Sequence, residues 1–258
     1  MEVSRADARR PDVVTAELKK GFAWTTQHSQ LVALTVVGLF VIGLIWAAVS
    51  AWNNSKEEGL QERYFAQEKA YTKKKEAFDK YSSTVNLPPD PKTKEIPKPE
   101  GEKASGDLNQ DYGPIIQGFQ AVIKDASSSH AAALSAMSLL QIYSDYQKPD
   151  EALATLKEVQ TSSGTLGVIT QYELGSQMAN KGDCKGALDL WAALAKNQRA
   201  EFLKPQMKLK MGVCSESLGD KTKAADLYRD VAESAGSKDT PTGKTAGKYL
   251  RLLEASKD

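Results

Sequence analysis

Apolar residues fill one long window near the start of the chain and recur at helical spacing after it. The run Leu31–Trp52 contains no charged residue. As a helix that rises about 1.5 Å per residue, the run measures roughly 33 Å, close to the hydrocarbon thickness of a bilayer. A helix also satisfies its backbone N–H and C=O groups internally, as lipid requires. The pattern therefore predicts a transmembrane helix, with Trp24 and Trp52 at the two membrane interfaces.

A cleaved signal peptide is the main alternative to this anchor. Val49-Ser50-Ala51 has the small side chains of a cleavage site. However, a tail of 30 residues precedes the run, and the run is longer than the apolar core of about 7–15 residues in a signal peptide. These two features favour an uncleaved anchor.

Basic residues near the ends of the run predict its orientation, because Lys and Arg concentrate on the cytoplasmic side of a span. The tail carries five, and the first twenty residues after the run carry three. These residues are Arg5, Arg9, Arg10, Lys19 and Lys20 before it, and Lys56, Arg63 and Lys69 after it. The tail is therefore predicted to be cytoplasmic and the rest of the chain to be exported.

The segment after the run is rich in Glu, Lys, Gln and Ala, which favour helix. Its aromatic residues Tyr64, Tyr71 and Phe78 are spaced by seven and predict an amphipathic helix. A homodimeric coiled coil is the alternative. The stripe also contains the polar Gln67 and Lys74, which favours packing of this helix on its own domain.

A proline-rich segment from Leu87 to Asp111 follows and holds half of the ten prolines. Proline removes a backbone donor and biases its predecessor to extended φ and ψ, so this segment is predicted to be an extended insertion. Beyond it, helix-forming runs alternate with short breaks. The predicted helices are 114–126, 130–147, 149–161, 165–181, 184–196, 200–218, 221–235 and 241–255.

These helical runs repeat. The sequence GDCKGALDLWAALA from Gly182 aligns with GDKTKAADLYRDVA from Gly219, and KPDEALATLKEV from Lys148 fits the same frame. The aligned alanines are 35 and 37 residues apart, and each is followed after four residues by a large side chain. The alanines are Ala152, Ala187 and Ala224, and the large side chains are Leu156, Trp191 and Tyr228.

A spacing near 35 is that of two antiparallel helices of about fifteen residues joined by short turns, which use roughly 34 residues. Gly175 and Gly212 on the first helices are expected to let the second helices approach, and the aromatic residues to fill the gap to the next pair. Because one pair cannot bury its apolar face alone, the pairs are expected to stack into a solenoid.

The repeat resembles the tetratricopeptide repeat, whose signature includes L-G-x-x-Y and A-x-x-x-F. The signature Trp is replaced by Ala136, Gln171 and Lys208. The complete layout of tail, span, long helix and degenerate repeats resembles the ancillary subunit family of the SecYEG translocon, best at Leu31–Trp52 and Ser129–Val159.

This resemblance implies a single-pass protein of the bacterial inner membrane, with a cytoplasmic N-terminus and a periplasmic tetratricopeptide-like domain. The implied function is non-enzymatic: a scaffold for protein transport that binds translocon subunits, periplasmic chaperones or exported chains. The alternatives are a scaffold for cell-envelope assembly or division that is unrelated to the translocon, and a coiled-coil structural oligomer.

The predicted fold class is all-α, with one transmembrane helix followed by a tetratricopeptide-like α-hairpin solenoid. The predicted parts are a cytoplasmic tail (1–23), the transmembrane helix (24–52), a long amphipathic helix (53–84), a proline-rich linker (85–112) and the repeat domain (113–258).

Solenoids bind partners along the concave face formed by the first helix of each pair. The predicted protein-binding groove is an apolar strip edged with amides, with the chain's own helices 56–82 or 241–255 as alternative occupants. Its residues are Met137, Gln141, Asp145, Tyr172, Ser176, Asn180, Gln206 and Leu209.

The two cysteines are predicted to be neighbours, because Cys184 begins a second helix and Cys214 lies late in the next first helix. In an oxidising compartment they can form a disulfide. Two buried free thiols are the alternative.

Composition and motifs exclude several other functions. The net charge of +1 argues against a nucleic-acid partner. Two cysteines and two histidines are too few and too scattered for the usual metal sites. No nucleotide-binding or hydrolase motif occurs, so no catalytic residue, cofactor or small-molecule substrate is predicted. Ser129 beside His130 is interpreted as a helix N-cap.

Overall fold

The structure is a computed structural model that describes residues 29–88, 94, 96–159 and 164–255, with the side chains of 29–38 and 53 outside the description. Every regular element in these ranges is a helix, which confirms the all-α prediction for this part of the chain. The helices are α2 Ser29–Thr84, α3 Leu108–Asp125, α4 His130–Asp145, α5 Pro149–Glu158, α6 Thr165–Asn180, α7 Cys184–Leu194, the 3₁₀ helix η2 Gln198–Leu203, α8 Lys204–Ser217, α9 Lys221–Glu233 and α10 Pro241–Ala255.

The chain divides into two compact units, Met1–Lys56 and Glu57–Asp258, and the boundary falls within α2. In the first unit, every side chain from residue 39 to residue 49 is exposed, although most of them are apolar. Across the described residues, none of the helices combines the length and the hydropathy that a membrane crossing requires. The predicted tail 1–23 and the side chains of 31–38 lie outside the described part of the chain.

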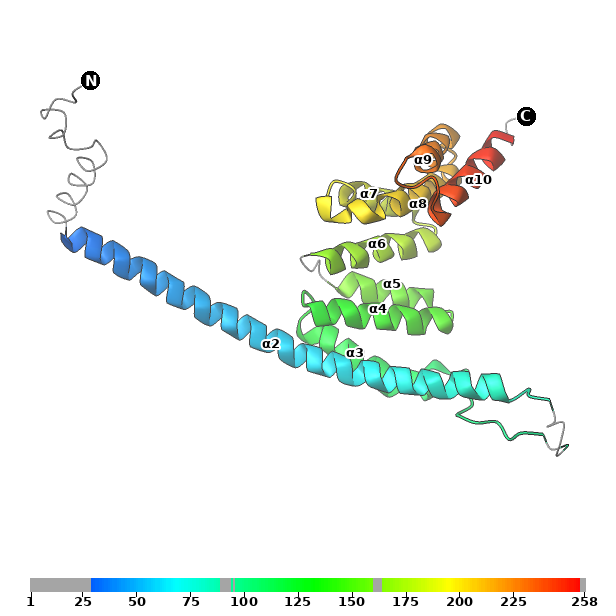
Figure 1. Ribbon diagram of the computed structural model, residues 1–258, viewed down its shortest axis with the longest axis horizontal. Helices are drawn as coiled ribbons and strands as arrows, with labels where there is room; N and C mark the ends of the chain where they lie inside the picture. The colour runs from blue at the N-terminus through cyan, green and yellow to red at the C-terminus, as the bar shows by residue number, and fades with distance from the viewer. Residues whose placement is uncertain (1–28, 89–93, 95, 160–163, 256–258) are drawn as a thin grey trace, which may run out of the picture. The chain divides into compact units, whose positions relative to one another are not determined.

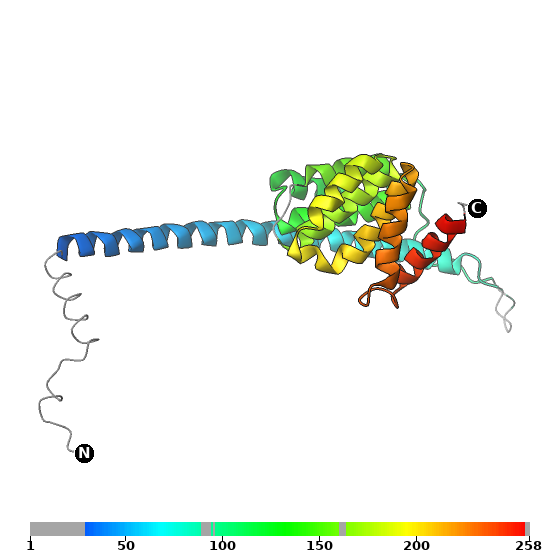
Figure 2. The same ribbon diagram turned by 90° about the horizontal axis from the view of Figure 1, so that it is seen from above.

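The second unit is a stack of helical hairpins. Helix α3 packs on α4, and the pairs α4/α5, α6/α7 and α8/α9 follow in chain order, with α10 packed on α9 and α8. Figures 1 and 2 show this order as a stack from α3 in green to α10 in red. Each hairpin corresponds to one predicted repeat, so the arrangement is tetratricopeptide-like.

The turns between paired helices follow from two residue types. Gly182 and Gly219 have φ values of +87° and +85°, which glycine adopts without a Cβ clash, and they follow α6 and α8. The next residues, Asp183 and Asp220, are N-caps whose carboxylates accept the backbone N–H of Gly186 and Lys223, at 2.9 and 3.0 Å.

The aromatic stripe of α2 packs within its own unit against α3. The ring centroids of Tyr64 and Phe119 are 5.9 Å apart, and Tyr112 lies 5.6 Å from Tyr71 and 5.7 Å from Phe78. All of these rings are buried. Packing within the chain therefore accounts for the seven-residue spacing of these aromatic residues without a coiled-coil partner.

The proline-rich segment returns along the end of α2. Its backbone N–H groups at Glu102 and Glu100 donate to the Ala77 carbonyl at 3.0 Å and to the Thr84 hydroxyl at 2.8 Å. Gly101 between them has a φ of +99°, and a Cβ there would lie 2.3 Å from the Ala77 oxygen. Residues 100–102 are thus held against α2, and the described residues 96–107 contain no helix or strand.

Two predicted helix starts are wrong. Helix α3 begins at Leu108 instead of residue 114, because the carboxylate of Asp107 caps it by accepting the N–H of Gln110 at 2.9 Å. The prolines before this cap masked the start. The predicted helix 200–218 is divided into η2 and α8, and Pro205 lies in the first turn of α8, where its missing N–H costs nothing.

Candidate protein-binding groove

The predicted groove residues lie on α4, α6 and α8, the first helices of the three hairpins, but their exposure differs. Gln141, Asp145 and Asn180 are exposed, whereas Tyr172 and Ser176 are buried. The remaining three, Met137, Gln206 and Leu209, are partly buried.

Tyr172 and Ser176 are buried beneath the surface of the groove. The Tyr172 side chain is 9% exposed, and its ring centroid lies 6.5 Å from that of Trp191. The Tyr172 carbonyl accepts the indole N–H of Trp191 at 3.2 Å and the Ser176 hydroxyl at 3.1 Å. Burial, together with the charge of neighbouring Glu173, raises the pKa of Tyr172 to about 12. Both predicted contact residues are therefore structural.

The chain's own helices contact the two ends of the predicted groove. On α4, the Asp145 carboxylate lies 3.9 Å from the ammonium of Lys75 on α2 and accepts the Gln141 amide at 2.8 Å. On α8, Leu209 packs with Leu250 of α10 against the buried Tyr228. The chain's own helices α2 and α10 therefore occupy the two ends of the predicted groove.

A cavity of about 320 Å³ remains between α6, α8 and α10. It contains two of the predicted groove residues, Asn180 and Leu209. Its other lining residues are Ala179, Cys184, Trp191, Lys210, Val213, Cys214, Ser217, Thr245 and Tyr249. A volume near the lower end of the 300–1,000 Å³ range of ligand pockets suits one or two side chains of a bound peptide.

A disulfide between Cys184 and Cys214 forms part of this lining. Their sulfur atoms are 2.28 Å apart and their Cα atoms 5.1 Å apart. The bond joins the first residue of α7 to α8, and both cysteines are buried. It therefore ties the second hairpin to the third directly beside the cavity.

The charge next to the cavity comes from Lys210 on α8 and Glu173 on α6. The Lys210 ammonium lies 5.9 Å from the centroid of the Tyr172 ring. Burial raises the pKa of the Glu173 carboxyl, and the charge of Lys210 acts in the opposite direction. Glu173 does not line the cavity itself.

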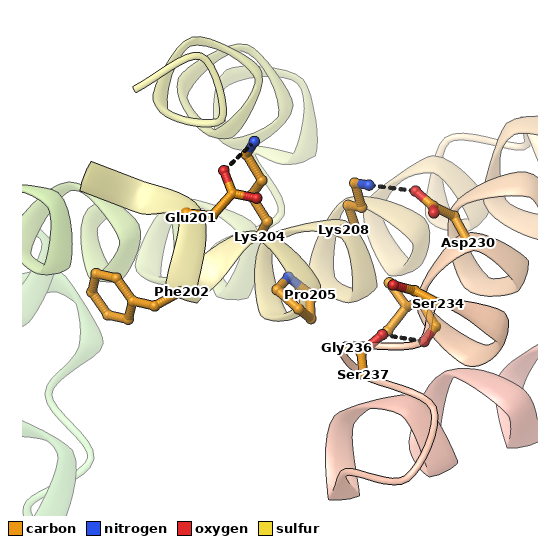
Figure 3. Close-up of a pocket in the computed structure, with 10 residues that line it drawn as sticks. Glu201, Phe202, Lys204, Pro205, Lys208, Asp230, Ser234, Gly236 and Ser237 are labelled. Atoms are coloured by element: carbon orange, nitrogen blue, oxygen red, sulfur yellow. Dashed lines mark hydrogen bonds and ion pairs between the residues drawn. The ribbon is translucent and has the colours of Figure 1, made fainter. Parts of the chain in front are cut away.

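A second cavity, also of about 320 Å³, is lined by η2, α8, α9 and the segment after α9 (Figure 3). Its lysines are already paired: Lys204 lies 2.6 Å from Glu201, and Lys208 pairs with Asp230. Because nearby carboxylates neutralise both lysines, we assign no ligand to this cavity.

The sequence did not identify Lys210, Val213 or Tyr249 as part of the groove. Val213 and Lys210 lie on α8 beside the predicted positions, and Tyr249 comes from α10. The amphipathic pattern of 241–255 predicts a helix, but it does not predict which face of the stack this helix covers.

No family model matches the chain, and no curated protein matches it. Among solved structures, the crystal structure of MamA is similar, with a TM-score of 0.40 and 20% identity over 60% of this chain and 91% of MamA. The tetratricopeptide-like assignment rests on the hairpins of this chain itself.

The candidate chemistry around Ser129 and His130 is a helix cap. The Ser129 hydroxyl accepts the N–H of Ala132 at 3.0 Å, as expected for an N-cap. Within the described ranges, no group of three or more His, Cys, Asp or Glu residues is arranged to hold a metal ion.

Proposed function

We propose that the protein is a membrane-anchored helical-repeat scaffold that holds a segment of a protein partner in the cavity between α6, α8 and α10. The observation that carries this proposal is the cavity itself. It has an apolar lining, and Val213 and Tyr249 are 41% and 38% exposed at its edge. Stacked hairpins present such concave surfaces to partners.

The proposed anchor is the run Leu31–Trp52, predicted from the sequence. Its described side chains support the proposal: Leu39 is 66% exposed, Phe40 71% and Trp46 74%. Apolar side chains on every side of a helix are stable only when something apolar covers them. The excess of basic residues before the run supports a cytoplasmic tail and an exported repeat domain.

We further propose that the partner belongs to the protein-export machinery, and that the protein is an accessory factor at the Sec translocon of the bacterial inner membrane. The support is the resemblance of the layout to the ancillary translocon subunit family. In this role the repeat domain lies in the periplasm and receives exported chains or the chaperones that bind them.

Site-specific crosslinking in intact membranes tests this function. A photoreactive amino acid replaces Gln141 or Asn180, two exposed positions on the first helices, in the full chain. The captured proteins are identified by mass spectrometry. We expect translocon subunits, periplasmic chaperones or exported chains.

The matched control carries the photoreactive group at Asp189, an exposed position on the second helix α7. If Asp189 captures the same proteins as Gln141 and Asn180 to the same extent, the groove is not the binding site. Capture only of envelope-assembly or division proteins from Gln141 and Asn180 would replace the translocon role by the alternative scaffold.

A further inference from the structure

The cavity between α6, α8 and α10 has one charged lining residue, Lys210, and its lining contains no aspartate or glutamate. Within the described part of the chain, the Lys210 ammonium forms no ion pair, and it lies over the face of the Tyr172 ring. Glu173 on α6 influences it from outside the lining.

Three lysines near the cavity differ from Lys210 in this respect, because each forms an ion pair. On the same helix, Lys204 and Lys208 pair with Glu201 and Asp230 (Figure 3). At the end of α6, the ammonium of Lys181 lies 2.7 Å from Asp150. The positive charge of Lys210 therefore remains available to a ligand beside an apolar surface, where water screens it less than in bulk solvent.

Uncharged polar groups complete the edge of the cavity. The Asn180 amide forms no hydrogen bond with any described residue, and neither does the Tyr249 hydroxyl. Both belong to exposed residues. They are free to hydrogen-bond to the backbone or carboxylate of a peptide, whereas Val213 and Leu209 supply apolar contact.

We infer that this cavity binds a peptide segment in which an apolar side chain adjoins an aspartate or glutamate, with the apolar group against Leu209 and Val213 and the carboxylate at Lys210. The inference rests on the proposed function and names the chemical class of its partner. The commitment to an acidic segment follows from charge complementarity, because like charges at a bound interface are strongly unfavourable.

Fluorescence anisotropy with three labelled peptides of equal length tests the inference on the full chain in lipid nanodiscs. The first peptide alternates Leu and Glu, the second replaces each Glu by Lys, and the third replaces each Leu by Ser. We expect the Leu-Glu peptide to bind about tenfold or more tightly than either of the others, since both apolar burial and the opposite charge are needed.

Lys210→Glu changes the sign of the charge at the cavity, and Lys210→Ala removes it. We expect Lys210→Glu to reverse the preference between the Leu-Glu and Leu-Lys peptides, and Lys210→Ala to abolish it. The control Lys196→Glu changes the net charge equally at an exposed residue outside the lining, and it should keep the wild-type preference.

An unchanged preference in both Lys210 variants would overturn the inference, and so would equal binding of the three peptides by the wild-type protein. Crosslinking at Asn180 distinguishes these failures from failure of the proposed function. If partners are still captured there while the peptide preference is absent, the scaffold function stands and only the acidic-apolar specificity is wrong.

Discussion

The indole of Trp191 lies directly on the backbone of Gly175: a Cβ at position 175 would be 2.5 Å from the indole Nε1. The third hairpin repeats this relationship, because a Cβ at Gly212 would be 2.4 Å from Cε1 of Tyr228. Both aromatic residues are fully buried. The glycine of the first helix and the aromatic residue of the second thus form one packing unit in each of these two hairpins. The aromatic residues also reach the next helices, as the sequence predicts: Trp191 shares a buried cluster with Met207 of α8, and the ring centroids of Tyr228 and Tyr249 on α10 are 5.6 Å apart.

Gly175→Ala and Gly212→Ala are expected to destabilise the protein. Alanine favours a helix interior over glycine by about 1 kcal/mol, but overpacking a closed core costs about 1–3 kcal/mol. Trp191 and Tyr228 are fully buried, and hydrogen bonds to the Tyr172 carbonyl and the Glu216 carboxylate hold them in place, so moving away from an added Cβ is costly. The measurement is the free energy of unfolding in denaturant. The control is Gly59→Ala in α2, where a Cβ meets nothing within 4 Å and the change is expected to be neutral or slightly stabilising. Equal effects at Gly59 and Gly175 would contradict this packing account.

The Cys184–Cys214 bond is expected to stabilise the repeat domain. It closes a loop with a sequence separation of 30, for which the loop-entropy relation gives roughly 3.7 kcal/mol. The double variant Cys184→Ala/Cys214→Ala should therefore unfold at a lower denaturant concentration. Reductant should lower the denaturant midpoint of the wild-type protein nearly to that of the variant, and it should leave the midpoint of the variant unchanged. If reductant does not change the unfolding midpoint of the wild-type protein, no disulfide is present.

Asp111 is expected to make stability depend on pH. Burial by itself raises the pKa of this carboxyl, but hydrogen bonds from the Tyr146 hydroxyl at 2.7 Å and from the Ser105 and Gly106 N–H groups outweigh burial and lower the pKa. A lowered folded-state pKa stabilises the protein above the unfolded value of about 3.9, and this stabilisation is lost as the pH falls through the folded value.

Tyr146→Phe isolates this effect. It removes one hydrogen bond to a charged group, which is expected to cost about 1.5–3 kcal/mol near neutral pH. The difference from wild type should shrink as the pH falls through the lowered folded-state pKa of Asp111, where the carboxylate becomes protonated. Tyr81→Phe is the control, because the Tyr81 hydroxyl has no hydrogen bond to a described residue. A Tyr146→Phe deficit that is constant with pH would contradict the role assigned to Asp111.

Ile42→Arg is expected to weaken the proposed anchor. Arginine near the centre of a span costs about 2.5–3.5 kcal/mol for insertion, so a larger fraction of the protein should be released from membranes by alkaline carbonate. Ala70→Arg, at an exposed site of α2 in the second unit, should leave the membrane-bound fraction unchanged. Complete extraction of the wild-type protein by carbonate would contradict anchoring.

The repeat and its turns were predictable because they depend on short-range signals. Gly182-Asp183 and Gly219-Asp220 end and start helices through local backbone conformation and capping. The seven-residue spacing of Tyr64, Tyr71 and Phe78 indicates one buried face at any length of helix.

The start of α3 was less predictable because its capping residue, Asp107, follows Gly106 in the proline-rich segment and is not a member of the apolar pattern. Asp107 and Asp111 act together there, one as the cap and the other by accepting the N–H groups of Ser105 and Gly106. Their joint effect depends on Tyr146, which lies in the sequence beyond α4 and comes into reach only through folding.

By itself, the sequence determined the all-α class, the hairpin period, the glycine and aromatic positions of the second and third repeats, and the uncharged run before them. All of these are set by neighbours within a turn or two of helix. Only the tertiary structure decided that Tyr172 is buried, that α10 covers Leu209, and that Lys210 lies beside a cavity without an ion pair to any described residue. Those features depend on which helix faces approach each other, and burial and charge pairing at such an approach are shared among residues that are far apart in the chain.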